Sequence, residues 1–513
     1  MNGNTQFKYR WWGKGDIDAS IGIFFDGFSK ILTATGIMTV VFGMPAQVVI
    51  GKVVPGIGLA ILLGNLWYFY EARCLAHKEK RHNVTSQPFG IGASQLSGWL
   101  YLIIGPVYWQ TGDSGLALQV GLAAAFVGGL VEVAGGFAGR WIVETIPNSA
   151  LMGNMASSAM VWLSIVGLAM VFDKPVYAVL PLFIIIIDYL GKADKRFAKI
   201  PSGVIAILIG TAVAWACGYL TPGALKDSFS EIGFYPPSLG IGDIAAGFKG
   251  IVPYLPVIIP LQINNFLSTL QGLESAKMAG DVYPERRSMI MDGVSTMTGA
   301  LFGNPFPTTV YFGHPGWKEL DARAGFSLVN GFLCLIICTT GLTGVLMALI
   351  PTEAVMVLLI FIGFSVTDNT FRSMDKKYYN VILLSMIPIL FQYVQTLISS
   401  SVQAAGLTMA AVTAEQFAAY SVPIQGIMYL GNGGFLTSLL LAGLLACVVD
   451  RRYKMAGAFA LVMAFCAAIG MIHCEGIALL TGPGVIFGTV YLTVAALLFM
   501  KGHFFEPGSG QRA

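Results

Sequence analysis

Apolar runs of helix length follow one another along almost the whole of this 513-residue chain. About sixteen of them reach or approach the length that a helix needs to cross the hydrocarbon core of a bilayer. Hydrophobic residues make up 55% of the chain and charged residues only 11%, which excludes a soluble enzyme and offers no basic surface for nucleic acid. The pattern predicts an all-α polytopic membrane protein in contact with the lipid bilayer. The runs lie at about 20–43, 47–70, 89–105, 115–138, 147–171, 175–190, 202–220, 251–276, 288–303, 308–322, 326–350, 352–367, 380–398, 424–449, 455–474 and 477–500.

The basic residues of the connections indicate the orientation of the spans. If the N-terminal tail is cytoplasmic, only Lys52, Lys174, Lys226 and Lys249 among the basic residues of the connections fall on the opposite side, as the positive-inside rule requires. The tail before Ile21 is polar and lacks the apolar stretch and cleavage site of a signal peptide. We therefore expect an integral protein of a bacterial inner membrane with a cytoplasmic N-terminus.

The stretch Met291 to Gly316 begins as an ordinary small-residue helix and then changes character. Its second half contains Pro305 and Pro307, a short β-branched and aromatic run, and a Gly-His-Pro-Gly sequence. Extended backbone at membrane depth leaves peptide groups unpaired, so it occurs only where protein or a water-filled cavity surrounds it. Transporters place their substrate at such broken helices.

Two sequence echoes indicate an internal repeat. The segment 146–152 is echoed by 350–356, each with a proline placed to start a helix, and 84–90 is echoed by 308–313, each a short extended run that ends in Phe-Gly. Ile-Pro and Phe-Gly could recur by chance in an apolar chain, but both pairs are seven spans apart. A shift of seven spans reverses orientation, so we expect inverted repeats at 20–220 and 251–449, followed by two additional spans at 454–500.

The run Arg287 to Gly316, with Asp292-Gly293, Gly299 to Gly303 and Thr308-Thr309, resembles the ninth and tenth spans of the xanthine/uracil permease family. This resemblance implies a secondary transporter with a 7+7 inverted repeat and short paired strands in spans three and ten. It also implies a core domain, 20–138 plus 251–350, that moves like an elevator against a gate domain, 140–220 plus 351–449. Coupling to protons or sodium and a homodimer through the gate domain are further implications. Sulfate-type and bicarbonate-type anion transporters share this fold.

The chain departs from the family at two positions. In the permeases, an acidic residue on span eight and an acidic or amide residue after the span-ten strand hold the base and couple a cation. The aligned positions here are Asn265 and Phe312. The main hypothesis is a permease of the xanthine/uracil type that moves a small planar or anionic solute, and the alternative is a transporter of a small inorganic or organic anion.

The residues beside the two predicted strands are the candidates for substrate binding, together with Asn265. Phe89 and Phe312 would stand at mirrored positions after the strands, where flat rings could stack on a planar heterocycle or simply pack. Gly90 and Gly313 leave backbone N–H groups open at half-helix ends. His314 adds a group that titrates near neutral pH.

Acidic residues inside spans are candidates for ion coupling. Asp26 lies four residues before Lys30, so it is either a coupling residue or half of a self-contained ion pair. Glu274 lies beside Lys277, and a structural pair is as consistent with this as a coupling role. Asp292 is expected to cap the start of span nine. We interpret three further acids near span ends as solvated or paired: Glu132, Glu144 and Asp188.

No metal, cofactor or enzymatic site is predicted. His473, Cys474 and Glu475 are consecutive, and neighbours on one short loop rarely converge on a metal. The seven cysteines imply no disulfide framework. An intramembrane enzyme would need clustered metal ligands or a nucleophile beside a base, and the five scattered histidines do not provide this.

Overall fold

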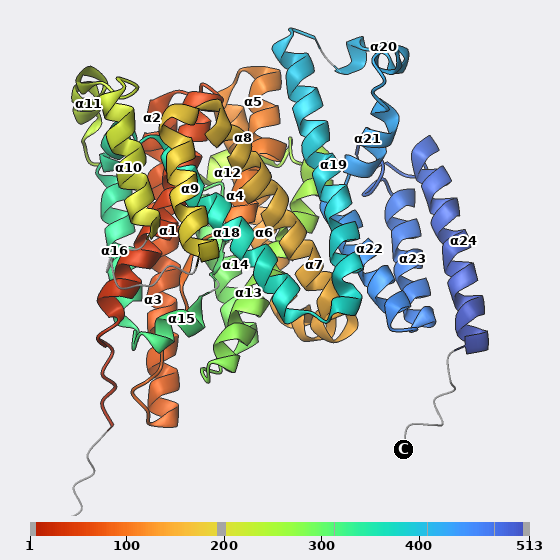
Figure 1. The fold of residues 1–513 in the computed structure, drawn as a ribbon, viewed down its shortest axis with the longest axis horizontal. Coiled ribbons are helices and arrows are strands. Elements are labelled where there is room, and N and C mark those ends of the chain that lie inside the picture. Colours follow the sequence, from red (N-terminus) through yellow and green to blue (C-terminus); the bar gives the residue numbers. More distant parts are fainter. Residues whose placement is uncertain (1–6, 192–201, 312, 408, 477, 506–513) are drawn as a thin grey trace, which may run out of the picture. The chain divides into compact units, whose positions relative to one another are not determined.

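The computed structural model describes residues 7–191, 202–311, 313–407, 409–476 and 478–505, and these residues are mostly helical (Figure 1). The chain divides into two compact units. Unit 1 comprises Met1–Ala138, Val166–Ile251 and Gln262–Phe361, and unit 2 comprises Gly139–Ile165, Val252–Leu261 and Ile362–Ala513.

Each predicted apolar run contains at least one helix of the structure. The elements of the first half are α1 Asp16–Gly36, η1 Ile37–Val41, α2 Ala46–Val48, η2 Val49–Val53, α3 Val54–Glu79, β1 Phe89–Ile91, α4 Ala93–Trp99, η3 Leu100–Ile104, α5 Gly105–Thr111, α6 Ser114–Thr145, α7 Asn148–Ser158, η4 Ala159–Ile165, α8 Val166–Asp173, α9 Pro175–Gly191, α10 Ser202–Ala216, α11 Pro222–Ser228, η5 Phe229–Glu231 and α12 Ile241–Gly247. The second half contains η6 Val252–Tyr254, α13 Leu255–Met278, α14 Glu285–Leu301, β2 Thr308–Val310, α15 His314–Glu319, α16 Gly325–Thr339, α17 Leu342–Leu349, α18 Thr352–Ser373, η7 Lys376–Tyr378, α19 Tyr379–Ala404, η8 Met409–Ala411, α20 Ala414–Ala419, α21 Ile424–Gly431, α22 Gly434–Val449, α23 Tyr453–Ala468 and α24 Gly482–Phe505.

Fewer helices pass a simple test for spans than the sequence pattern predicted. Within the described residues, six helices are long and apolar enough to cross a membrane, and the count rises to eight if each of two bent helix pairs is one span. The α16–α17 pair bends by 89° and the α21–α22 pair by 75°. Among the segments that do not pass, α13 carries the buried polar side chains of Gln262 and Asn265.

The two strands β1 and β2 pair antiparallel within unit 1. Phe89 is opposite Val310 and Ile91 is opposite Thr308. The backbone pairing extends beyond both strands, because Gly92 N donates to the Pro307 carbonyl and Tyr311 N to the Pro88 carbonyl. The sequence predicted short paired strands in spans three and ten, and the structure confirms them. Antiparallel pairing is what an inverted repeat requires at this point.

Helices α1, α3 and α16 pack together in unit 1, with α16 lying along α3 (Figure 1). Asp16 at the start of α1 is fully buried and accepts hydrogen bonds from the backbone N–H groups of Gly13, Arg323 and Phe326. The last two groups lie at the start of α16, so the Asp16 carboxylate satisfies helix-end donors that would otherwise lack partners. This contact fixes α1 against the segment that follows α15.

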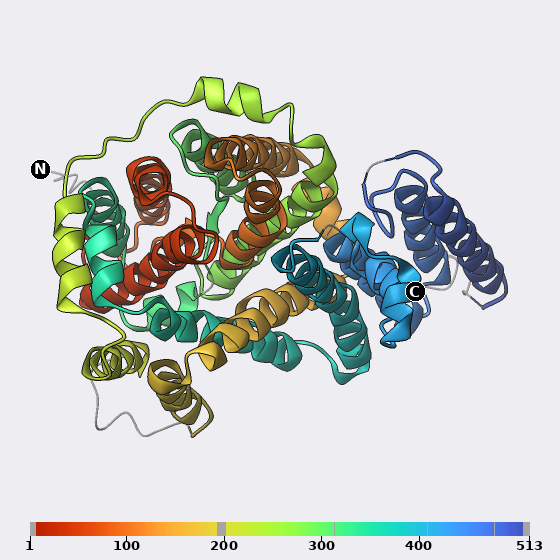
Figure 2. The same ribbon diagram turned by 90° about the horizontal axis from the view of Figure 1, so that it is seen from above.

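Unit 2 has its own apolar core, in which α19 packs against α7, α21 and α22. Helices α23 and α24, which cover the predicted additional spans, lie side by side (Figures 1 and 2). Their contact faces include Phe459, Met463 and Ala495, which belong to one cluster with Leu440 and Leu444 of α22. The C-terminal pair is thus anchored to α22 by apolar packing.

Candidate functional site

The strand β1 is held against α3 by the ring of Phe89. This ring is fully buried and packs with Tyr68 and Val310. A Cβ atom at Gly64 of α3 would collide with the Phe89 ring, so glycine is required at this close approach. Asn65 Nδ2 donates to the Phe89 carbonyl at 3.2 Å. Phe89 therefore lies within the strand, with its ring turned into the core of unit 1.

The residues that follow β2 contact α1. The ammonium group of Lys30 lies 3.4 Å from the centre of the Tyr311 ring and 2.7 Å from the Asp26 carboxylate. Lys30 is the only lysine or arginine that is buried among the described residues, whereas the Asp26 side chain is 25% exposed. A Cβ atom at Gly90 would collide with the Tyr311 hydroxyl, which has no hydrogen-bond partner among the described groups. Asp26, Lys30, Tyr311 and Gly90 thus form one cluster at the paired strands.

A second polar group lies at the other end of β2. Asn265 Nδ2 donates to the Thr308 carbonyl at 2.9 Å and to the Glu132 carboxylate at 3.1 Å. Gln262 Nε2 donates to the other oxygen of Glu132 at 3.0 Å. All three side chains are fully buried, and the amide oxygens of Asn265 and Gln262 have no partner among the described residues. Of the two interpretations of Glu132, solvated or paired, the solvated one is therefore wrong, and the helix α6 continues for thirteen residues beyond it to Thr145.

A glycine pattern on α6 explains how α13 and α14 approach Glu132. Gly128 and Gly135 face Gln262 and Phe266 of α13, and Gly129 and Gly136 face α14. These glycines lie three and four residues on either side of Glu132, so they share its helical face. Small residues at such spacing let helices pack closely in membranes. This glycine pattern is visible in the sequence and could have identified Glu132 as a residue on a closely packed, buried helix face.

Asp292 is buried between α3, α13 and β2. Its carboxylate accepts hydrogen bonds from the Tyr68 hydroxyl, from Thr269 Oγ1 at 2.6 Å and from the Val310 N–H. Thr269 Oγ1 also lies 2.9 Å from Thr309 Oγ1, which joins this network to β2. Asp292 does not cap span nine as expected, because α14 begins at Glu285, a full seven residues earlier.

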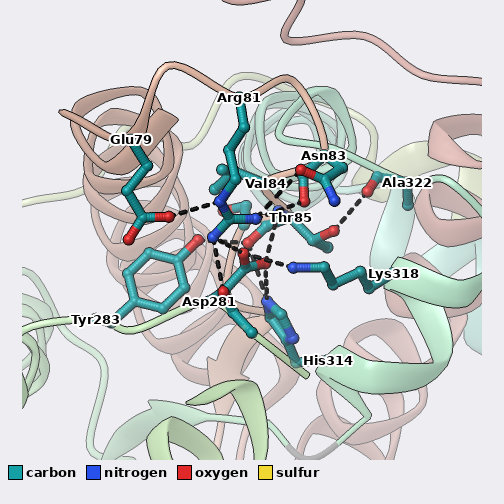
Figure 3. Close-up of polar contacts among 12 residues, drawn as sticks. Glu79, Arg81, Asn83, Val84, Thr85, Asp281, Tyr283, His314, Lys318 and Ala322 are labelled. Carbon is teal, nitrogen blue, oxygen red and sulfur yellow. Dashed lines mark hydrogen bonds and ion pairs between the residues drawn. The ribbon is translucent and has the colours of Figure 1, made fainter. Parts of the chain in front are cut away.

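A cluster of charged residues surrounds Asp281 in the connection between α13 and α14 (Figure 3). Its carboxylate lies 2.7 Å from Arg81 Nη2, 2.5 Å from Lys318 Nζ and 3.2 Å from His314 Nε2. The backbone N–H of Thr85, just before β1, also donates to Asp281 at 3.0 Å. Figure 3 shows these side chains converging on one buried carboxylate. The cluster ties the approach to β1 to the helix α15 that follows β2.

The charge balance of this cluster is reflected in the pKa of Asp281. Burial alone would raise that pKa, but hydrogen bonds from His314, Lys318 and Thr85 outweigh burial and lower it from 3.8 to about 2. His314 Nε2 also lies 3.0 Å from the Thr85 carbonyl, so both contacts of this ring nitrogen are to the Asp281 cluster. His314 is fully buried, and its Nδ1 has no partner among the described residues.

The remaining predicted site residues lie in different surroundings. Glu274 is exposed and forms an ion pair with Lys277 at 3.0 Å. Gly313 is exposed and precedes α15 with φ of 113°, a conformation that favours glycine. Phe312 lies outside the described residues. The structure thus brings Phe89, Gly90, Asn265 and His314 close to the paired strands, with Asp26 on the adjacent helix.

Unit 2 contains a cavity of about 840 Å³ between α19, α21 and the loop that follows α23. Among its lining residues, His473 contacts the Tyr429 carbonyl at 2.6 Å and the Tyr491 hydroxyl at 2.7 Å. No group of three or more potential metal ligands exists among the described residues, here or elsewhere. The cavity is remote in sequence from the broken spans and contains none of the predicted site residues.

Comparisons with known proteins identify the fold. No family model matches the sequence, and no curated protein matches it. The structure of the murine Solute Carrier 26 family member A9 (Slc26a9) anion transporter in the inward-facing state matches with a TM-score of 0.52 and 13% identity, covering 75% of this chain and 66% of that chain. A second SLC26A9 structure matches with a TM-score of 0.49 and 14% identity, covering 73% and 62%. The transmembrane domain of a cyanobacterium bicarbonate transporter, BicA, matches with a TM-score of 0.48 and 15% identity, covering 73% and 94%.

The likeness to murine Slc26a9, at a TM-score above 0.5, carries the conclusion about architecture. The chain spans about two thirds or less of the length of the two SLC26A9 chains. Sequence identity this low supports a shared fold but does not identify the transported substrate. This chain is an all-α polytopic membrane protein with the inverted-repeat fold of the SLC26-type transmembrane region.

Proposed function

We propose that this protein is a secondary transporter of a small anion and that the anion binds where the broken spans three and ten meet. The proposal is carried by the position of Lys30, the one buried lysine or arginine among the described residues, which lies on the Tyr311 ring directly after β2. A buried ammonium group is a strong partner for an anion, because charge-assisted contacts gain strength away from water. The names of the similar structures, an anion transporter and a bicarbonate transporter, support the same cargo class.

Asp26, the ion-pair partner of Lys30, is placed so that a substrate anion can replace it on the ammonium group. Asp26 is a quarter exposed, so water can solvate its carboxylate when another anion takes its place on Lys30. A fully buried partner would instead be left uncompensated, at a high cost in free energy. Asp26 therefore neutralises the charge of Lys30 while no substrate is bound.

The observed packing gives less support to a nucleobase as cargo. The stacking hypothesis needs a free aromatic face, and the Phe89 ring is buried against Gly64 and Tyr68. Asn265 occupies the position of the acid that holds the base in the permeases, and its Nδ2 is engaged with Glu132 and Thr308. The resemblance of Arg287 to Gly316 to the xanthine/uracil permeases remains the argument for that alternative.

Movement of the cargo would follow the elevator mechanism. The core segments, 20–138 plus 251–350, would carry the site past the gate segments, 140–220 plus 351–449, and the gate would form the homodimer. The distribution of basic residues supports a cytoplasmic N-terminus in a bacterial inner membrane. These parts of the proposal follow from the sequence pattern and the family resemblance.

Uptake into proteoliposomes tests the proposal directly. Purified protein would be reconstituted and supplied with labelled chloride, sulfate, bicarbonate, uracil and xanthine in parallel. We expect uptake of one or more of the anions and of neither nucleobase. Uptake of uracil or xanthine without any anion would overturn the proposal in favour of the permease alternative.

A matched pair of lysine variants tests the site. Lys30→Met should lower anion uptake by about tenfold or more, because a hydrogen bond to a charged group contributes roughly 1.5–3 kcal/mol. Lys52→Met is the control, since Lys52 forms an ion pair of similar geometry with Asp243 at 2.5 Å but is 35% exposed. Equal anion uptake by both variants would show that Lys30 does not bind the anion.

A further inference from the structure

Glu132 is a buried carboxylate with no basic partner among the described residues. It is fully buried, and within the described part of the chain its two oxygens accept hydrogen bonds only from the neutral amides of Asn265 and Gln262. Removing an ionised carboxylate from water without a counter-charge is strongly unfavourable. Such a group is stable when it carries a proton, or when it gains a cation during function.

The described groups that face Glu132 from neighbouring elements do not supply a positive charge. Asp292 of α14 and Tyr68 of α3 are the titratable groups that act on it electrostatically, and α13 presents the two amides. A second carboxylate nearby makes ionisation of Glu132 still less favourable, because like charges repel. The surroundings therefore favour binding of a proton over the bare anion.

The two amides can serve both protonation states of Glu132. Their N–H groups donate to the carboxylate as observed, while both amide oxygens lack partners among the described residues. Rotation of either amide by half a turn would present that oxygen as an acceptor for a carboxylic O–H. This pair of side chains is thus able to stabilise Glu132 before and after it takes up a proton.

Asn265 connects Glu132 to the broken spans. The same Nδ2 atom contacts Glu132 and the Thr308 carbonyl of β2, and the amide oxygen faces Gly92, directly before α4. Tyr311, on which Lys30 lies, is three residues beyond Thr308, or roughly 10 Å at the rise of an extended strand. Asn265 separates Glu132 from Thr308 by two further hydrogen bonds, so Glu132 lies on the order of 15 Å from the proposed anion site.

We propose that Glu132 binds the proton that this transporter moves together with its anion. The proposal rests on the proposed function and names its coupled ion. An anion at Lys30 is repelled by an ionised Glu132, so protonation should strengthen anion binding several-fold for charges on the order of 15 Å apart at an effective dielectric constant of about 20. The proton adds to a Glu132 oxygen on the side where the anion enters and leaves from that oxygen on the opposite side.

Anion-driven proton flux provides the first test. Proteoliposomes loaded with the pH dye pyranine would be given an inward gradient of sulfate or of chloride. Wild-type protein and the exposed control Glu274→Gln should acidify the interior, whereas Glu132→Gln should abolish acidification and retain one-for-one anion exchange. Equal acidification by Glu132→Gln would overturn the proposal, as would its loss in Asp26→Asn alone.

Infrared difference spectroscopy provides a second test that needs no substrate. One component of the buried carboxyl C=O band should titrate with pH in wild-type protein and in Glu274→Gln and should be lost in Glu132→Gln, whereas the component of Asp292, which is also buried, should remain. If Glu132→Gln fails to fold, Glu132→Asp keeps the carboxyl group and should shift both the band and the pH midpoint of the flux. A band unchanged in either Glu132 variant contradicts the proposal.

If the wild type carries no anion, the proposed function fails, and this band still decides whether Glu132 takes up a proton.

Discussion

Two buried acidic clusters of unit 1 differ in how their charge is balanced. Asp281 contacts Arg81, Lys318 and His314, so two cationic side chains balance its negative charge. Glu132 is equally buried, but its donors among the described residues are two neutral amides. Both lie beside the paired strands, one at the approach to β1 and α15, the other at the start of β2.

The difference separates a structural role from a functional one. A carboxylate beside two cationic side chains and a histidine ring gains little from taking up a proton, so the Asp281 cluster suits a permanent tie between the segments around β1 and α15. A carboxylate without a counter-charge responds to any proton or ion that reaches it. We therefore expect changes at Asp281 to affect stability and changes at Glu132 to affect transport.

The largest effect is expected for Asp281→Asn. Removal of this charge leaves Arg81 and Lys318 without their common partner, and breaking a buried ion pair costs about 3–5 kcal/mol. Thermal unfolding in detergent, followed by intrinsic fluorescence, should show a large fall in the midpoint, with Glu274→Gln as the exposed control. An unchanged midpoint would mean that the cluster does not hold the fold, and the contrast with Glu132 would disappear.

A smaller effect is expected for Gly64→Ala, which tests whether packing alone holds β1 in place. The added Cβ would collide with the Phe89 ring, and overpacking of a filled core costs up to about 3 kcal/mol. Gly242→Ala in α12 is the matched control, because nothing lies within 4 Å of its Cβ position. If both variants melt at the same temperature, the Phe89 ring is not tightly packed and stacking on a planar substrate becomes credible again.

Acid should destabilise the protein by protonating Asp281, and the effect should be smaller than those of the two substitutions above. The pKa of Asp281 is lowered from 3.8 to about 2 in the folded protein, so its contribution is complete above about pH 5 and is lost as the pH falls through 4 towards 2. The loss amounts to about 2 kcal/mol. Melting curves between pH 6 and pH 2 should show this loss in wild-type protein and a reduced loss in Asp281→Asn. Parallel curves for the two proteins would contradict the assignment.

The smallest effect is expected at the surface. The Glu274–Lys277 pair is more than half exposed on both sides, and exposed pairs contribute less than about 1 kcal/mol. Glu274→Gln should therefore change neither the melting midpoint nor anion uptake. A marked loss of uptake in this variant would restore Glu274 as a coupling residue at the expense of Glu132.

The sequence predicted the broken spans well and the polar network poorly. The proline pair 305 and 307 and the echo between 84–90 and 308–313 indicated the two strands, because local backbone chemistry determines where a helix must stop. The i,i+4 spacing of Asp26 and Lys30 likewise indicated their ion pair. These are short-range features, which a single sequence can reveal.

The partners of Glu132 and His314 depend on contacts between distant segments. Glu132 and Asn265 are 133 residues apart, and His314 and Thr85 are 229 apart, so spacing along the chain gave no sign of either contact. Asp292 was assigned to a helix end because the start of span nine was placed too late. The glycine pairs around Glu132 were the one local sign of a buried, closely packed helix face.

A bound heavy anion would test the central claim most directly. Crystals soaked in bromide, a monovalent anion whose anomalous signal can be located, would show where this protein holds negative charge. The account predicts a peak beside Lys30 and Tyr311 that is lost in Lys30→Met. A peak confined to the unit 2 cavity beside His473 and Asn432, with nothing at the paired strands, would contradict it.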